Sequence, residues 1–432
     1  MSKKHRFTRR AFLGTSLAGV AGLTLIPGCR IFRPSDTVRL GFIGLGRQSM
    51  YLLSSFIRME GVKVVAGADV YGIKNLRFER EVKNYYAESD IETDVQTYTD
   101  YRELLEREDI DAVVIASPDH WHYHMATDAV SSGKDVYLEK PLTFTIPEGQ
   151  KLVEAVRAAD RILGVGSQQR SDPGFIHAVD LVKEGRLGPL RKVDVYVGPE
   201  PFPIPYDLPV EEVPADLDWN GWLGPNPRVH YNHELNPPIS LDPPSNEEIW
   251  GAWRWYKETG GGLMTDWGAH MFDIGQWGLG TDRSGPVRVI PPGYENNEFL
   301  KYVYDSGLEM ELQPFDEQTR GVKFWGIDAW VEVSRGKFNA SEEELKPVVK
   351  ETETPYEARN EHHLDFIRAV KDHEDPVVPV EIGHRTNSVC VLGNIAHELG
   401  RPLDWDPENE QFRDDAEATG YLSREYNNRY SL

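Results

Sequence analysis

A glycine-rich turn at residues 41–49 reads Gly41-Phe42-Ile43-Gly44-Leu45-Gly46-Arg47-Gln48-Ser49. An apolar strand pattern at 38–44 leads into this turn, and a helical pattern at 48–59 follows it. A second apolar strand pattern then spans 62–68 and ends at Asp69. This order predicts a strand–helix–strand unit with two parallel strands.

The turn matches a GxGxxG pattern, in which Ser49 replaces the last small residue. Gly44 permits the tight turn, and Gly46 lets the backbone approach a diphosphate at the start of a helix, where unpaired amides favour anions. A carboxylate at Asp69 would accept hydrogen bonds from an adenosine ribose and repel a 2'-phosphate. We therefore expect residues Gly44, Leu45, Gly46, Arg47, Gln48, Ser49 and Asp69 to bind NAD in preference to NADP. The alternative is an ordinary strand-to-helix turn with Asp69 as a helix cap.

The alternation of strands and helices continues to about residue 166. Further helices are predicted at 101–106, 124–132 and 148–159, and further strands at 112–116, 135–138 and 162–166. Such alternation is typical of a doubly wound parallel sheet. We expect a Rossmann dinucleotide-binding domain at 37–166.

The composition of the sequence changes after residue 167, where a Pro- and Trp-rich connection occupies 199–244. Strand-like runs follow at 191–197, 287–290, 301–304, 308–312 and 326–333, and their close spacing predicts a mostly antiparallel sheet. Two helical patterns, 361–371 and 383–399, close this part of the chain. We expect a second α/β domain at 167–405 and an acidic tail at 406–432.

The charge balance restricts the partners of the protein. The 47 Lys and Arg residues against 70 Asp and Glu residues give a net charge of -23. A general positive field that would hold nucleic-acid phosphate or anionic lipid is therefore excluded. We expect a small or neutral partner and no nucleic acid.

The first 36 residues read as an export signal and linker. Basic residues at 3–10 precede an apolar run at 11–26 that is shorter than the roughly 20 residues a membrane-spanning helix needs. Thr8-Arg9-Arg10-Ala11-Phe12-Leu13 resembles a twin-arginine motif, which directs folded, cofactor-loaded proteins to export. Ile26-Pro27-Gly28-Cys29 resembles a lipoprotein cleavage box in which Cys29 is acylated, although Pro27 is unusual there. We expect a periplasmic protein without a transmembrane span; a cytoplasmic protein with a basic, apolar tail is the alternative.

Three further motifs occur in a fixed order along the chain. They are Ser117-Pro118-Asp119-His120-Trp121-His122, Glu139-Lys140-Pro141 and Gly261-Gly262-Leu263-Met264-Thr265-Asp266-Trp267-Gly268-Ala269-His270. Together with Gly44-Leu45-Gly46 they resemble the Gfo/Idh/MocA family, which includes glucose-fructose oxidoreductase and inositol dehydrogenase. The resemblance extends from about residue 38 to the C-terminus.

The resemblance implies a Rossmann domain followed by an α/β domain whose open antiparallel sheet often forms an oligomer interface. We therefore expect a homo-oligomer, either a dimer or a tetramer. It also implies that Lys140, Asp266 and His270 are catalytic and that His122 lies near the nicotinamide. We also assign cofactor binding to the other residues that follow the strand ends: Ser117, Pro118, His120, Glu139, Lys140 and Gln168.

The chemistry of the three catalytic candidates is consistent with hydride transfer. If residues 266–270 are helical, Asp266 and His270 share one face, and the carboxylate can orient the imidazole and raise its basicity. His270 could then take the hydroxyl proton, while Lys140 stabilises developing charge on the reacting oxygen. Without the resemblance, Lys140 could be a solvated loop lysine, Asp266 a helix cap and His270 a core residue.

Several other residues are candidates for the same site. Gln168 and Arg170 follow the sixth strand pattern and could contact sugar hydroxyls or the cofactor amide. Five tryptophans could stack on sugar rings or fill the core: Trp219, Trp222, Trp250, Trp253 and Trp255. We assign substrate binding to Arg170, Trp253, Asp266 and His270. The histidines at 120, 122 and 124 resemble a metal cluster, but no nearby carboxylate or cysteine completes one, so we expect no metal.

These observations predict an exported NAD-dependent oxidoreductase that acts on a secondary hydroxyl of a sugar, glycoside or cyclitol. Because free NAD is not expected outside the cytoplasm, the cofactor should be tightly bound. One alternative is an NAD-dependent glycoside hydrolase that oxidises, eliminates, hydrates and reduces its substrate without net redox. Another is a sugar-binding lipoprotein without turnover, against which the complete set of Lys140, Asp266 and His270 argues.

Overall fold

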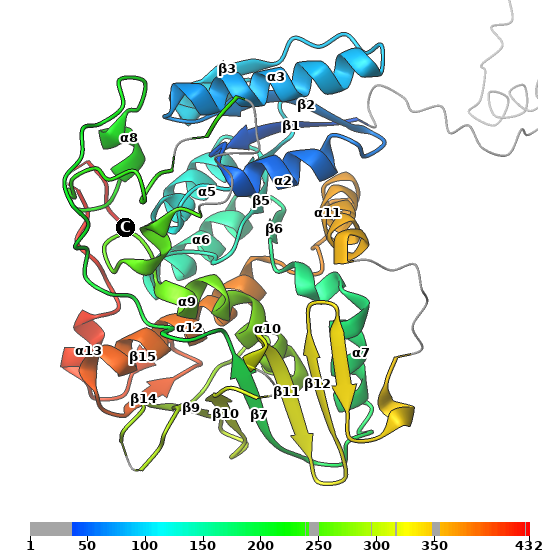
Figure 1. Ribbon diagram of the computed structural model, residues 1–432, viewed down its shortest axis with the longest axis vertical. Coiled ribbons are helices and arrows are strands. Elements are labelled where there is room, and N and C mark those ends of the chain that lie inside the picture. Colours follow the sequence, from blue (N-terminus) through cyan, green and yellow to red (C-terminus); the bar gives the residue numbers. More distant parts are fainter. Residues whose placement is uncertain are drawn as a thin grey trace, which may run out of the picture. The chain divides into compact units, whose positions relative to one another are not determined.

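The computed structural model describes residues 37–432 except 238, 242–249, 295, 316–317, 348–354 and 428, and the side chains of 355–359 (Figure 1). The predicted export signal and lipidation site at 1–36 lie outside the described residues. Among the described residues, no helix combines the length and the apolar character that crossing a bilayer requires.

The first sheet has six parallel strands in the order β3-β2-β1-β4-β5-β6. Its strands are β1 (Val38–Ile43), β2 (Val62–Ala68), β3 (Gln96–Tyr98), β4 (Ala112–Ile115), β5 (Asp135–Leu138) and β6 (Leu163–Val165). The connecting helices are α2 (Arg47–Phe56), α3 (Gly72–Glu88), α4 (Tyr101–Leu105), α5 (His122–Ser131) and α6 (Ile146–Ala158). The strand order reverses between β1 and β4, which is where doubly wound sheets bind ligands. The predicted Rossmann-type parallel sheet is confirmed.

The register of this sheet gathers the predicted cofactor residues at one edge. Ile43, at the end of β1, pairs with Ala68 of β2 and with Ile115 of β4. The glycine-rich turn, Asp69 and Ser117 follow these three strand ends directly. Residues far apart in the sequence therefore emerge side by side.

The second sheet has nine strands in the order β13-β12-β11-β7-β10-β9-β8-β14-β15. Its pairs are antiparallel except β7 with β10. The strands are β7 (Leu190–Tyr196), β8 (Arg288–Ile290), β9 (Leu300–Val303), β10 (Glu309–Leu312), β11 (Gly321–Gly326), β12 (Trp330–Ser334), β13 (Lys337–Ala340), β14 (Leu403–Asp406) and β15 (Gln411–Phe412). This arrangement confirms the mostly antiparallel sheet of the second part.

Helices cover one face of the second sheet and form its core. α7 (Pro173–Lys183) contacts β12, α10 (Gly268–Leu279) contacts β7 and β11, and α12 (Val380–Leu399) contacts β8. Buried apolar side chains on β7 and α10, among them Val193, Val195 and Phe272, belong to one hydrophobic cluster. The remaining helices are α8 (Trp219–Leu223), α9 (Gly262–Asp266), α11 (Pro355–Asp372) and α13 (Ala416–Gly420).

The two sheets are joined by more than their connecting loop. α11, which comes late in the chain, packs beside α2 and β1 of the first sheet (Figure 1). Phe366 and Ile367 of α11 are buried in the hydrophobic cluster of β1 and α2. The amide of Val165 in β6 also donates to the carbonyl of Val378 at 3.0 Å.

Two local predictions are corrected by the structure. The run 326–333 is not one strand: it contains the last residue of β11, the hairpin turn at 327–329 and most of β12. The exposed side chain of Ile327 makes the turn read as apolar. The acidic segment 406–432 is not a simple tail. It contains β15 and α13 and then returns to the first domain, where Arg424 pairs with the buried Glu148 at 2.7 Å.

Candidate active site

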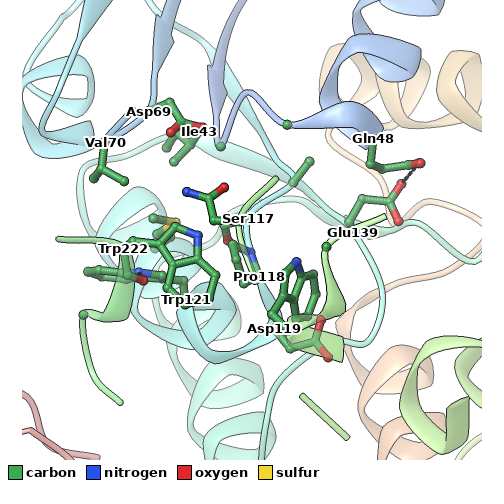
Figure 2. A pocket seen from close by; sticks show the side chains of 18 of the residues that line it. Ile43, Gln48, Asp69, Val70, Ser117, Pro118, Asp119, Trp121, Glu139 and Trp222 are labelled. Carbon is green, nitrogen blue, oxygen red and sulfur yellow. Dashed lines mark hydrogen bonds between the residues drawn. The ribbon is translucent and has the colours of Figure 1, made fainter. Parts of the chain in front are cut away.

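A cavity of about 1190 Å³ lies at the strand ends of the first sheet and extends to α9 and α10. Its lining includes Gly44, Gly46 and Asp69 from the first domain. Lys140, Asp266 and His270 line the same cavity. Figure 2 shows Asp69, Ser117, Pro118 and Glu139 around it. The structure thus brings most of the predicted cofactor residues and all three catalytic candidates together.

The glycine-rich turn depends on the absence of two side chains for different reasons. Gly44 has φ +76°, and a Cβ there would lie 2.8 Å from the amide nitrogen of Ser117. Gly46 is the N-cap of α2, where no side chain caps the helix, and a Cβ there would meet nothing within 4 Å. The first amides of α2 are therefore open to the cavity, as the diphosphate of a dinucleotide requires.

Asp69 is held by two backbone amides. Its Oδ2 accepts from the amide of Leu45 at 2.7 Å, and its Oδ1 accepts from the amide of Tyr71 at 2.9 Å. Each carboxylate oxygen retains acceptor capacity for a ribose hydroxyl, whereas a 2'-phosphate would meet like charge. The residues present therefore fit NAD.

Lys140 and Asp266 form an ion pair in the catalytic part of the cavity. Nζ of Lys140 donates to Oδ1 of Asp266 at 2.7 Å and to its main-chain carbonyl at 2.9 Å. This carbonyl is available because the helix is interrupted: α9 ends at Asp266, and the amide of His270 bonds to Trp267 instead, at 3.0 Å. Residues 266–270 are thus two helix ends rather than one continuous helix.

The charge of Asp266 is maintained by its cationic neighbours. Burial raises the pKa of such a carboxyl, but the positive charges of Lys140, Arg254 and Arg320 outweigh burial and lower the pKa of Asp266. Nε of Arg254 lies 3.5 Å from Oδ1 of Asp266. The carboxylate therefore remains ionised and keeps the ammonium of Lys140 in place.

His270 is a largely buried side chain at the start of α10. With its amide nitrogen turned toward the ring, Gln169 donates to Nδ1 of His270 at 2.6 Å. The amide oxygen of Gln169 then accepts from Nε and Nη2 of Arg335 at 3.3 and 3.2 Å. Gln169 was not among the predicted site residues, although it follows the predicted Gln168 directly.

The pKa values of two buried carboxyls in the cavity are raised, whereas that of Asp266 is lowered. Burial raises the pKa of Asp119 to about 7, with the charge of Asp266 adding to this and those of Arg254 and Lys140 opposing it. Burial also raises the pKa of Glu139, whose Oε1 accepts from the side-chain amide of Gln48 at 2.8 Å (Figure 2). Glu139 thereby links the loop after β5 to the first turn of α2.

Tryptophan side chains line the wall near Arg254. The guanidinium of Arg254 lies 4.1 Å from the ring centroid of Trp253 and 5.0 Å from that of Trp250. Arg47 approaches the ring of Trp250 at 4.5 Å. Trp253 therefore lines the cavity as predicted, but a guanidinium lies over its ring.

Arg170 is a correction to the predicted substrate site. Its guanidinium is almost completely buried and pairs with Asp273 at 2.8 Å and Asp282 at 2.7 Å. Because its guanidinium is bound by these two carboxylates, the first of which belongs to α10, Arg170 does not line the cavity.

His120 and His122 also lie outside the cavity lining, in contrast to their predicted contact with the cofactor. The ring of His120 contacts the carbonyls of Trp222 at 3.0 Å and Thr259 at 3.3 Å. The ring of His122 contacts the carbonyls of Pro141 at 2.7 Å and Ser117 at 3.0 Å. Burial lowers the pKa of His120 to about 3 and that of His122 to about 4, so both rings are neutral and tie loops together.

Leu45 and Ser49, which were also predicted to bind the cofactor, do not line the cavity either. Leu45 supplies its amide to Asp69, and Ser49 packs as a buried small residue of α2. His124 packs against Tyr426 and Tyr430. Within the described part of the chain, no group of three or more His, Cys, Asp or Glu side chains is arranged to hold a metal ion.

Comparisons with known proteins agree with this architecture. Residues 38–167 match the Gfo/Idh/MocA model described as "Oxidoreductase family, NAD-binding Rossmann fold". Residues 204–432 match the model described as "Oxidoreductase family, C-terminal alpha/beta domain".

Individual relatives have low sequence identity to this chain. An uncharacterized oxidoreductase, YrbE of Bacillus subtilis, is 25% identical over 84% of this chain and 91% of its own length. Glycosyl hydrolase family 109 protein 1 of a Shewanella species is 31% identical over 36% of this chain and 34% of its own length, so the match spans about a third of that relative. The fold resembles scyllo-inositol dehydrogenase of Lactobacillus casei, solved with NAD(H) and scyllo-inositol, at a TM-score of 0.57 and 15% identity, covering 85% of this chain and 99% of that one. Because the two family models together match most of the chain, the protein belongs to the Gfo/Idh/MocA family of NAD-binding oxidoreductases.

Proposed function

We propose that the protein transfers hydride between a secondary hydroxyl of a sugar, glycoside or cyclitol and a tightly bound NAD. The observation that carries this proposal is that the dinucleotide cradle at Gly44 and Gly46 shares one cavity with Lys140, Asp266 and His270. The names of the relatives, an inositol dehydrogenase and a glycosyl hydrolase among them, support the carbohydrate class.

Lys140 is the group that would stabilise charge on the reacting oxygen. Its ammonium has three N–H donors, and two of them are used by the side chain and the carbonyl of Asp266. The third is left for an alkoxide-like oxygen of the substrate. Asp266 therefore serves as the positioning residue for Lys140.

His270 would hold and move the proton of the same hydroxyl. The contact from Gln169 to Nδ1 places the proton of the neutral ring on Nε2, which suits donation to a carbonyl oxygen during reduction. In the oxidation direction, the amide of Gln169 must turn so that Nδ1 carries the proton and Nε2 accepts one. When bound, NAD supplies the acceptor or donor of hydride at the carbinol carbon.

The proposed location is the periplasm, after export by the twin-arginine route, with a lipid anchor at Cys29 and a homo-oligomeric assembly. The supporting features are the Arg9-Arg10 pair and the Cys29 box. Replacing Arg9 and Arg10 with Lys should retain the protein in the cytoplasm, whereas Cys29→Ala should release it from the membrane fraction. Unchanged fractionation of both variants would contradict the proposal.

The test uses the enzyme as purified, without added NAD. Native and denaturing mass spectrometry should find bound NAD and give the subunit number. A panel of sugars, cyclitols and aryl glycosides is then followed for absorbance of the reduced nicotinamide and for keto-sugar. If bound NAD is found but no substrate yields reduced nicotinamide or keto-sugar, the proposal is rejected.

The partial match to family 109 glycosyl hydrolases favours a second candidate, a hydrolase that uses NAD without net redox. The same assay separates the two activities. Release of the aglycone without accumulation of keto-sugar or reduced nicotinamide identifies the hydrolase, and accumulation of either product identifies the oxidoreductase.

A further inference from the structure

Part of the Pro- and Trp-rich connection packs on the junction between β2 and α3, which begins with the ribose candidate Asp69. The amide of Gly72 in this junction donates to the carbonyl of Asp216 at 2.9 Å. The amide of Asp218 donates back to the carbonyl of Val70 at 3.0 Å. The connection is thus hydrogen-bonded to the junction in both directions, as two neighbouring strands are.

Side chains reinforce these main-chain bonds. Oδ2 of Asp216 accepts from the amide of Ile73 at 3.1 Å. Leu217 pairs with Tyr71 in an antiparallel bridge, and both side chains belong to one buried cluster with Tyr231. Burial of a leucine contributes substantially to holding a short segment in place. Asp216 and Leu217 do not line the cavity, so their contacts attach the segment to the first domain.

The other end of the same segment is attached at two further places. Nζ of Lys74, in the first turn of α3, donates to Oδ1 of Asn236 at 2.7 Å, and both side chains are buried. The amide of Asn427, which follows α13, donates to the carbonyl of Pro225 at 2.9 Å. We call residues 216–237 the clasp, because they are held both by the β2–α3 junction and by the segment after α13.

The clasp forms a wall of the cavity at its cofactor end. Val70, the residue after Asp69, packs against the hydrophobic cluster that contains Trp222 and Leu235. Figure 2 shows Trp222 in the part of the pocket that holds Val70 and Asp69. Trp222, Leu235 and Asn236 all line the cavity. The clasp therefore covers the strand ends where the adenosine of a dinucleotide binds.

Asn236 has a hydrogen-bond donor that the described part of the protein does not use. Its side chain lines the cavity, and the residue is only 3% exposed. The bond from Lys74 identifies Oδ1 as the acceptor, which leaves Nδ2 as a buried donor without a partner among the described residues. Such a donor costs free energy unless a ligand accepts from it. The ribose hydroxyls and ring nitrogens of adenosine are acceptors of the required kind.

We propose that the clasp is a further part of the NAD-binding site, which encloses the adenosine half of the cofactor and keeps it bound from one turnover to the next. Nδ2 of Asn236 donates to this half. Release of NAD then requires the contacts of residues 216–218 to open, which is a local unfolding step. This inference rests on the proposed function and names the segment that is responsible for tight binding.

Exchange of the bound cofactor tests the proposal without requiring turnover. The protein loaded with NAD is mixed with an excess of deuterium-labelled NAD, and the bound species is followed over time by mass spectrometry. The native protein should retain its unlabelled NAD through gel filtration. Leu217→Ala should exchange roughly 10- to 100-fold faster, since it removes a buried contact of the clasp without altering the cavity wall. Complete exchange in the native protein during mixing would overturn the proposal.

Two controls separate opening of the clasp from a general loss of stability. Leu345→Ala removes a leucine that is as buried as Leu217 but lies outside the clasp and the cavity lining, and it should exchange at the native rate. Asp216→Ala should also accelerate exchange, whereas Asp216→Asn, which keeps an acceptor for the amide of Ile73, should not. If Leu217→Ala exchanges at the native rate, or Leu345→Ala exchanges as fast as Leu217→Ala, the clasp is not the barrier and the proposal fails.

Asn236→Asp tests the contact with the cofactor itself. The aspartate keeps an acceptor for Lys74 and removes only the donor Nδ2. In the same exchange assay, NAD should dissociate roughly 10-fold faster, which is the factor expected for one hydrogen bond. A native dissociation rate in Asn236→Asp would refute the donor role of Asn236.

The outcomes also separate this inference from the proposed function. Slow exchange that Leu217→Ala accelerates, in a protein without any hydride transfer, would retain the clasp and reject the oxidoreductase. Hydride transfer in a protein whose exchange Leu217→Ala does not accelerate would retain the oxidoreductase and reject the clasp.

Discussion

The two ends of the active-site cavity are built in different ways. The cofactor end is made largely from consecutive backbone between Gly44 and Gln48, together with the carboxylate of Asp69, which two amides hold. The catalytic end is made from side chains of distant segments, with Lys140 and Asp266 lying 126 positions apart in sequence. A backbone site is sensitive to local conformation, whereas a side-chain site is sensitive to the pairing of its charges.

Lys140→Met should have the largest effect, because it acts on both catalysis and stability. Turnover should fall by roughly 10²- to 10³-fold through the loss of a donor to the reacting oxygen. The free energy of unfolding should also fall by about 1.5–3 kcal/mol, since Asp266 loses its principal charged partner in a partly buried pair. Steady-state kinetics and denaturant unfolding measure the two effects.

The double variant Lys140→Met/Asp266→Asn is the control for the stability effect. It should recover part of the lost stability, because the unpaired carboxylate is gone, but none of the turnover. Full stability in Lys140→Met alone would mean that the ion pair does not hold this end of the cavity together.

His270→Ala should lower turnover by roughly 10²- to 10⁴-fold, the range of general acid–base catalysis, while NAD remains bound. The reason is that His270 lies at the catalytic end, away from the glycine-rich turn. Rapid-quench kinetics and the NAD content of the purified protein would measure this. The exposed His373 provides the control, and His373→Ala should be fully active. Unchanged turnover in His270→Ala would exclude the imidazole from the mechanism.

Two alanine substitutions in the glycine-rich turn should differ sharply. Gly44→Ala places a side chain at φ +76° and 2.8 Å from a backbone nitrogen, so it should destabilise the fold by at least 1–2 kcal/mol. Gly46→Ala has space and an ordinary φ, so it should change stability by less than about 1 kcal/mol and reduce bound NAD instead. Thermal unfolding and NAD content test this pair. Equal NAD loss in two equally stable variants would contradict the different roles.

Asp119→Asn should have the smallest effect on stability of these substitutions, and that effect should depend on pH. Burial raises the pKa of Asp119 from 3.8 to about 7, so the folded protein binds a proton in that window and loses stability as the pH rises through it. Above this window the native protein bears the full penalty of a buried carboxylate beside Asp266, partly offset by Arg254 and Lys140. The asparagine variant should therefore gain melting temperature relative to the native protein at pH 8 but not at pH 4. A difference that does not vary with pH would show that Asp119 titrates normally.

The parts of the fold that depend on local pattern were predictable. The parallel sheet follows from apolar strands separated by helices, and β5 has the predicted bounds, Asp135–Leu138. α3 was missed because its sequence is mostly polar, with a weakly apolar face against β2. The β11–β12 hairpin was misread because an exposed isoleucine lies in its turn.

The site was predictable where a motif marks it and not where tertiary pairing decides. Lys140, Asp266 and His270 were named by resemblance, and the structure brings them to one cavity. Arg170 was misassigned because its neighbours Asp273 and Asp282 are about a hundred residues away in sequence. Arg335, which contacts Gln169, was missed because only the register of the β11–β12 hairpin brings it to the cavity.

The return of the chain's last residues to the first domain has a consequence for the timing of folding. Oε1 of the completely buried Glu148 in α6 accepts from Arg424 and from Tyr426. Until the ribosome has released these residues, that oxygen has to stay hydrated, and the wall around α5 and α6 stays unfinished. We therefore expect the nucleotide-binding domain to mature only after Arg424 and Tyr426 have been translated, and substitutions at these two residues to destabilise the first domain.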